Sequence, residues 1–167
     1  MKSYELFQRM SPALAAEILR HLQKEQTSVF KNVVNALASQ RKLRSVFIER
    51  KLPDERYAWI KSALAGKTND TLAAHLLQAW LLGAQKPMLC DFLDSLGVAH
   101  DEDGTVEQLP ESPPREKLRE TVDQLLAKYP AETLAVYLHA FHDMDSTVSW
   151  PPLGEILQED ERLRLRS

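Results

Sequence analysis

Apolar residues recur at spacings of three and four along most of the chain, which places them on one face of an α-helix. In residues 12–26, Leu14, Ile18 and Leu22 share such a face. Residues 72–84 are apolar on almost all sides, which predicts the most buried helix of the protein. The pattern predicts an all-α fold of eight or nine short helices, arranged as an antiparallel helical bundle or as a short stack of helix pairs.

The helical pattern that begins near residue 27 is interrupted at residues 39–42. The next positions in phase with its apolar face are Arg41 and Arg44, which are charged. This change predicts a break or kink and then a further short helix that ends near Arg50. Apolar residues return there in a different phase and are expected on its buried side: Leu43, Val46 and Phe47.

Residues 98–113 carry no helical pattern and form the best candidate for a boundary. They join a turn signal at Asp101–Gly104 to a proline-rich connection. We expect either one domain over 1–167 or a division into helical parts 1–97 and 114–167. Short extended segments at Val98 and Val106 are candidates for a hairpin across the turn. The charged residues after Glu161 are expected to fray.

Three segments share a similar order of leucine and alanine. They begin at residues 14, 72 and 134, at separations of 58 and 62 residues. One interpretation is a helical repeat, in which each unit packs on its neighbour. The other is chance, because leucine and alanine are the strongest helix formers.

Composition excludes several classes of function. The 167 residues are 44% hydrophobic and 27% charged, as in ordinary globular proteins. Cys90 is the only cysteine, which excludes internal disulfides and thiolate zinc sites and fits a reducing cytoplasm. No two of the five glycines are close enough to form a phosphate-binding loop. We therefore expect a cytoplasmic protein with no cofactor and no membrane association.

Charge is distributed unevenly along the chain. Residues 1–68 hold 13 Lys and Arg against 6 Asp and Glu, a net of +7, whereas the remainder has a net of −10. A polyanion such as nucleic acid would gain affinity from the densest basic segment, 41–51, by releasing counterions. The alternative is a solvated basic surface. The candidate binding residues are Arg41, Lys42, Arg44, Arg50 and Lys51.

Two sets of histidines and carboxylates suggest metal chemistry. His139, His142 and Asp143 fall on one face of a predicted helix, an arrangement in which two imidazoles and a carboxylate can bind one divalent metal ion. The second set, His75, His100-Asp101 and Asp145, resembles the metal-ligand set of helical HD phosphohydrolases. That resemblance covers these four residues and implies a metal-dependent hydrolase.

No motif identifies a reaction centre. The expected function is therefore a non-enzymatic interaction protein that offers a helical groove or a charged face to a protein partner or to a second copy of itself. The alternatives are a nucleic-acid-binding module that uses segment 41–51 and the metal-dependent hydrolase.

Overall fold

The computed structural model describes residues 1–144 and 150–166, and in this part of the chain the fold is all-α, as predicted. Ten α-helices form here, of which nine have seven residues or more, and the tenth is the five-residue α4. The hairpin expected at Val98 and Val106 is wrong, because the described residues contain no strand. Asp101 instead closes a tight loop by donating its N–H to the carbonyl of Thr105 at 2.8 Å.

The chain divides into two compact units, which we describe separately. The N-terminal unit comprises Lys2–Trp80 with Arg166, and the C-terminal unit comprises Leu81–Leu165 with Met1. The division lies inside helix α6 (Asp70–Ala84), whereas the proline-rich connection at 98–113 lies within the C-terminal unit.

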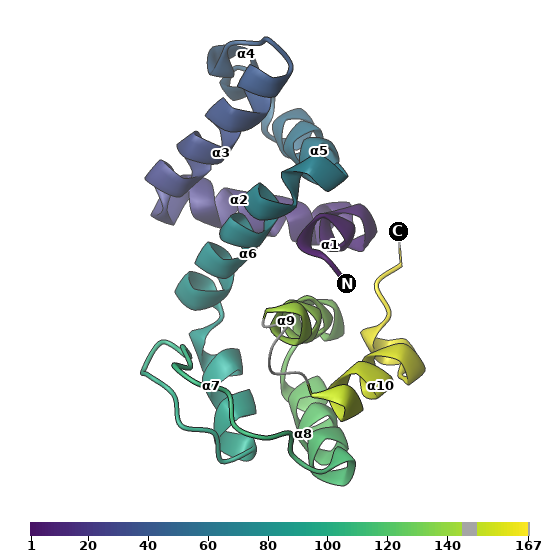
Figure 1. Ribbon diagram of the computed structural model, residues 1–167. Coiled ribbons are helices and arrows are strands. Elements are labelled where there is room, and N and C mark those ends of the chain that lie inside the picture. The colour runs from purple at the N-terminus through teal and green to yellow at the C-terminus, as the bar shows by residue number, and fades with distance from the viewer. Residues whose placement is uncertain (145–149, 167) are drawn as a thin grey trace. The chain divides into compact units, whose positions relative to one another are not determined.

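The N-terminal unit is built around helix α2 (Pro12–Glu25), which Ser11 caps by accepting a hydrogen bond from the N–H of Leu14. The apolar face of α2 packs against its neighbours α3 and α5. The short α4 connects α3 to α5 (Figure 1). The remaining elements of this unit are α1 (Ser3–Arg9), α3 (Thr27–Gln40), α4 (Ser45–Glu49), α5 (Pro53–Leu64), η1 (Lys67–Asn69) and the first part of α6.

The core of the C-terminal unit is aromatic. Edge-to-face contacts join Phe92 to Tyr137 and Phe141, with ring centroids 5.5 and 5.3 Å apart. Trp150 is buried beside Phe141, and Trp80 is buried in the other unit, so both tryptophans are core residues. The helical elements after α6 are α7 (Lys86–Ser95), α8 (Arg115–Lys128), α9 (Ala131–Asp143), α10 (Pro151–Glu159) and η2 (Glu161–Leu163).

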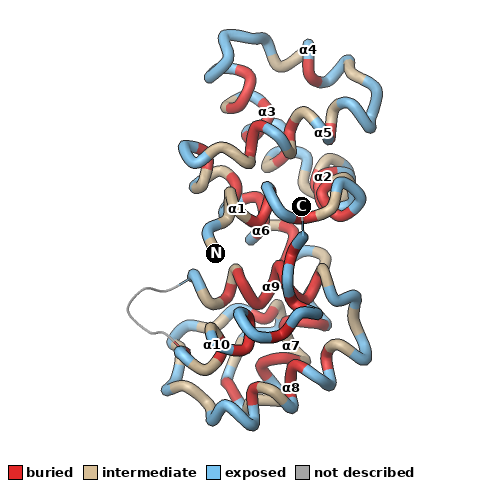
Figure 2. The backbone as a smooth tube through the Cα atoms, turned by 90° about the vertical axis from the view of Figure 1, so that its right-hand side faces the viewer, coloured by how far each residue is buried: buried red, intermediate tan, exposed pale blue. Residues whose placement is uncertain are grey.

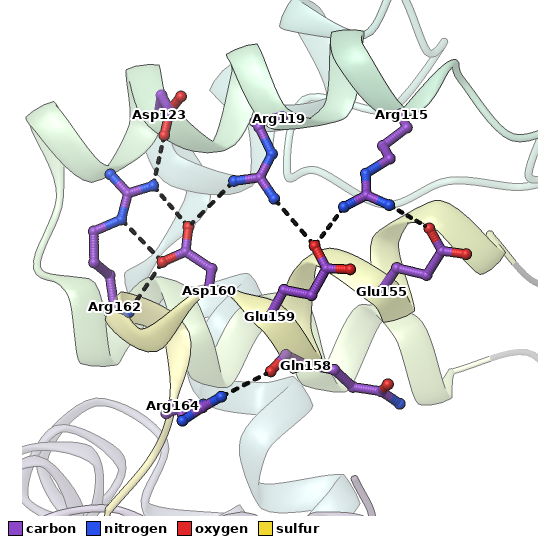
Figure 3. A network of polar contacts seen from close by, with 9 residues as sticks. All are labelled: Arg115, Arg119, Asp123, Glu155, Gln158, Glu159, Asp160, Arg162 and Arg164. Atoms are coloured by element: carbon purple, nitrogen blue, oxygen red, sulfur yellow. Dashed lines mark hydrogen bonds and ion pairs between the residues drawn. The ribbon is translucent and has the colours of Figure 1, made fainter.

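A network of ion pairs fastens α10 and η2 to α8 (Figure 3). Arg162 contacts Asp160 at 2.6 Å and Asp123 at 2.7 Å, while Arg115 contacts Glu155 at 2.8 Å and also Glu159. The guanidinium of Arg162 lowers the pKa of Asp160, whose side chain is almost fully buried. The expected fraying after Glu161 is wrong for η2, because this network and the buried Leu163 hold it.

Candidate functional site

The basic segment predicted from the sequence forms the turn between α3 and α5. We call residues 41–52 the basic tip. In Figure 2 the backbone around α4 is coloured largely as exposed. Four of the five predicted cations are exposed and Lys51 is half-buried. Within the described residues none of the five forms an ion pair.

Helix α3 ends in a left-handed turn that begins the tip. Lys42 has φ +55°, the only positive φ at a non-glycine position among the described residues. Its N–H donates to Ser39, and the N–H of Leu43 donates to Ala38, at 3.0 and 2.9 Å. This pair of bonds is the Schellman motif, in which glycine normally occupies the position of Lys42. The sequence predicted a break or kink near residues 39–42, and the structure shows a break, because α3 ends at Gln40 and α4 begins at Ser45.

Arg56 of α5 holds the other end of the tip. Its guanidinium donates to the carbonyls of Glu49 and Lys51 at 2.7 and 2.9 Å. It also donates to the side chain of Gln23 on α2, which accepts a second bond from Tyr57. These contacts bind the end of α4 to the core of the unit, so the tip is a fixed surface rather than a loose loop.

The apolar residues of the tip do not lie where the sequence pattern placed them. Phe47 is 58% exposed and Leu43 is 42% exposed, so the prediction that they face the core is wrong. The reason is geometric: α4 has five residues and buries a single one, Ile48. Leu52, at the junction with α5, is 69% exposed. Three of the four exposed large hydrophobic residues in the described chain therefore lie in the tip.

Trp59 extends the tip onto α5. The guanidinium of Arg41 lies 5.1 Å from the centroid of the Trp59 ring, within the range of a cation–π interaction. Trp59 is half-buried, so it anchors Arg41 at the base of the tip. Sequence reasoning missed Trp59 because it lies eighteen positions after Arg41, in a different helix.

A groove of about 750 Å³ lies beside α2 and α5 in the same unit. Small side chains line it, and Tyr57 is buried at its edge. Four of these small residues are Ala13, Ala16, Ala58 and Ser62. Charged side chains also line it, namely Arg20, Asp54 and Lys61, although the surface of the groove is mostly apolar.

The predicted metal residues lie at the end of α9. His139 is buried, Asp143 is exposed, and burial lowers the pKa of His142, which is half-buried. Among residues 1–144 and 150–166, no group of three or more His, Cys, Asp or Glu side chains is arranged to hold a metal ion. The side-chain positions thus give no support to the metal prediction.

Three of the four residues that resemble an HD ligand set lie in the described part of the chain. His75 is exposed on α6, and Asp145 lies outside the described residues. Both ring nitrogens of His100 are engaged at 2.6 Å, with the carboxylate of Asp94 and the carbonyl of Asp101. Both partners are acceptors, so the ring satisfies both only as an imidazolium, and that form has no lone pair for a metal. These two contacts raise the pKa of His100.

Comparison of the chain with protein-family models, curated proteins and solved structures found no match. None of the described helices has the length and apolar character needed to cross a bilayer.

Proposed function

We propose that this is a cytoplasmic, non-enzymatic interaction protein whose contact surface is the basic tip, and that its protein partner presents carboxylates around apolar side chains. The observation that carries the proposal is the exposure of Leu43, Phe47 and Leu52 within a segment whose five cations form no ion pair with the residues that the structure describes. Single exposed apolar residues are common on protein surfaces, but a group of them in one segment is typical of contact sites.

The composition of the tip favours a protein partner over nucleic acid. Cations alone suffice for binding phosphates, and large aliphatic groups gain nothing from a phosphate backbone. Arginine and aromatic residues surrounded by apolar groups are the residues that dominate binding energy between proteins.

The carboxylates near the tip argue against an anionic membrane as the partner. Glu49 lies inside the tip, and Asp54 and Glu55 follow it; all three are exposed. An anionic lipid surface would repel them, whereas a protein surface can place a cation opposite each one.

A peptide selection tests the proposal. Random displayed peptides would be selected on the wild-type protein, and the recovered peptides measured against Phe47→Ser and against Arg44→Ser. Matched controls are Met144→Ser, which changes an apolar side chain of similar exposure (61%), and Lys31→Ser, an exposed lysine outside the tip. We expect the recovered peptides to be rich in acidic and large apolar residues. Their affinity should fall about tenfold or more for each tip variant and should be unchanged for both controls.

Two results would contradict the proposal. The first is peptides that bind the tip variants and the wild type equally. The second is a tip that shifts DNA or RNA in a gel at low salt, or that sediments with vesicles of phosphatidylserine and phosphatidylcholine, while no peptide is recovered. In that case the partner of the tip is a polyanion or a membrane.

A further inference from the structure

The basic tip carries a strong net charge on a basic unit. Its five cations and Glu49 give the tip a formal charge of +4. The N-terminal unit as a whole has 14 Lys and Arg against 7 Asp and Glu, a net of +7. A partner for this surface must therefore supply several carboxylates together with apolar contacts.

The same chain contains a segment with the complementary character. Residues 101–111, here called the acidic loop, hold five carboxylates and no Lys or Arg. Val106 and Leu109 are half-buried between them and expose part of their apolar surface. The C-terminal unit that carries the loop has 7 Lys and Arg against 17 Asp and Glu, a net of −10. The exposed carboxylates are Asp101, Glu102, Glu107 and Glu111.

Contacts along its length fix the acidic loop to the C-terminal unit. Gly104 lies so close to α7 that a Cβ atom there would be 2.7 Å from the Cβ of Leu89. The thiol of Cys90 donates to the carbonyl of Glu102 at 3.5 Å, and the indole of Trp150 donates to Pro110 at 3.1 Å. The loop therefore presents its carboxylates from a defined backbone, which lowers the entropy lost when it binds.

We propose that the acidic loop of a second copy of this chain binds the basic tip, so that the protein self-associates. This inference rests on the proposed function, because it names one partner of the same surface. The basic tip has a charge of +4 and the acidic loop has five carboxylates, so the two surfaces attract each other. Both segments also add exposed apolar groups to the contact. Each copy carries one tip and one loop, and a contact between unlike surfaces either closes a ring or extends an open chain.

The association is expected to be weak and dependent on salt. Two segments of this size bury less than the roughly 1,200 Å² that marks the lower limit of stable complexes. Exposed charges at their edges are screened within about 10 Å at 0.1 M salt and within about 3 Å at 1 M. Self-association should therefore appear at high micromolar protein and be reduced by salt.

Charge reversal at exposed positions tests the inference. The tip variant is Lys42→Glu with Arg44→Glu, and the loop variant is Glu102→Lys with Glu107→Lys. Each would be followed by sedimentation velocity over a range of concentrations at about 0.1 M and about 1 M salt. Unfolding curves that match the wild type would show that both variants fold. We expect the wild type to self-associate at low salt, and each variant alone to remain monomeric.

Mixing the two variants gives the deciding measurement. The reversals reduce the formal charge of the tip from +4 to 0 and that of the loop from −5 to −1. The loop variant keeps the wild-type tip and the tip variant keeps the wild-type loop, so these two surfaces still attract each other in the mixture. An equimolar mixture should therefore associate into pairs of one copy of each variant, although neither variant associates alone. A wild type that is monomeric throughout would overturn the inference, and so would a mixture that does not associate. Peptides that bind the tip in the selection above would leave the proposed function standing in either case.

Discussion

Substituting Lys42 with glycine should stabilise the protein. Lys42 occupies the left-handed position that ends α3, with φ +55°. Side chains of L-residues crowd the backbone in this conformation, and glycine has no Cβ to crowd it. The hydrogen bonds of the turn are made by backbone groups alone, so Lys42→Gly leaves them intact.

The size of the effect follows from two opposing terms. The left-handed conformation costs an L-residue roughly 1–2 kcal/mol, which glycine avoids. Glycine also has more freedom in the unfolded chain, and fixing it costs roughly 0.5–1 kcal/mol. The net gain in the free energy of unfolding is about 0.5–1 kcal/mol. For a chain of this length each kcal/mol corresponds to about 2–4 °C in melting temperature.

Urea and thermal unfolding, followed by circular dichroism, measure this gain. Lys42→Ala is the matched control, because it removes the same charge and keeps the strained Cβ. We expect Lys42→Ala to lie within about 0.5 kcal/mol of the wild type. If alanine stabilised the protein as much as glycine, charge repulsion in the tip would be the source of the gain. The reasoning about φ would then be refuted.

Three further changes probe the C-terminal unit. Asp160→Ala should lower the free energy of unfolding by about 1.5–3 kcal/mol, because it removes the buried acceptor of Arg162. Urea unfolding measures this loss, and Glu161→Ala, which changes an exposed carboxylate, is the control. Gly154→Ala places a Cβ 3.0 Å from the His142 ring. Alanine is the better helix former by about 1 kcal/mol, but this gain in the free energy of unfolding should appear only when His142 is also replaced by alanine. Equal effects with and without His142→Ala would disprove the contact. The raised pKa of His100 means that its contribution to stability is present below its unfolded pKa of about 6.5 and is lost as pH rises through the folded value. His100→Asn should therefore destabilise the protein more at about pH 5 than at about pH 8, and a difference independent of pH would refute the assigned contacts.

The sequence pattern predicted the helices because each of them buries one face. Ile18 and Leu22 on α2 are fully buried, as their spacing requires. The same logic failed in the tip, where α4 is too short to have a repeating face. Apolar spacing there did not distinguish Ile48, which is buried, from Phe47, which is exposed. The turn at Lys42 and the proline at position 53 enclose α4, but only the proline is visible in the sequence, because a lysine does not mark a left-handed turn.

The division into two units could not be predicted, because it falls inside one continuous helix. Proline, glycine and polar residues mark boundaries in loops, and α6 has none of these at the division between Trp80 and Leu81. The proline-rich connection at 98–113 gave the stronger signal. Its end is nevertheless tied into the C-terminal unit by the hydrogen bond from Trp150 to Pro110.

Three local preferences of folded chains are broken together in the basic tip. Large apolar side chains are exposed, cations lie without ion pairs in the described chain, and a lysine occupies a position that suits glycine. Natural sequences generally satisfy local and global preferences together, and departures concentrate where function requires them. Elsewhere the same unit follows the rules: Ser11 caps α2, and Arg56 satisfies the carbonyls at the end of α4. The departures therefore lie on a well-held scaffold, which is what a surface selected for binding requires.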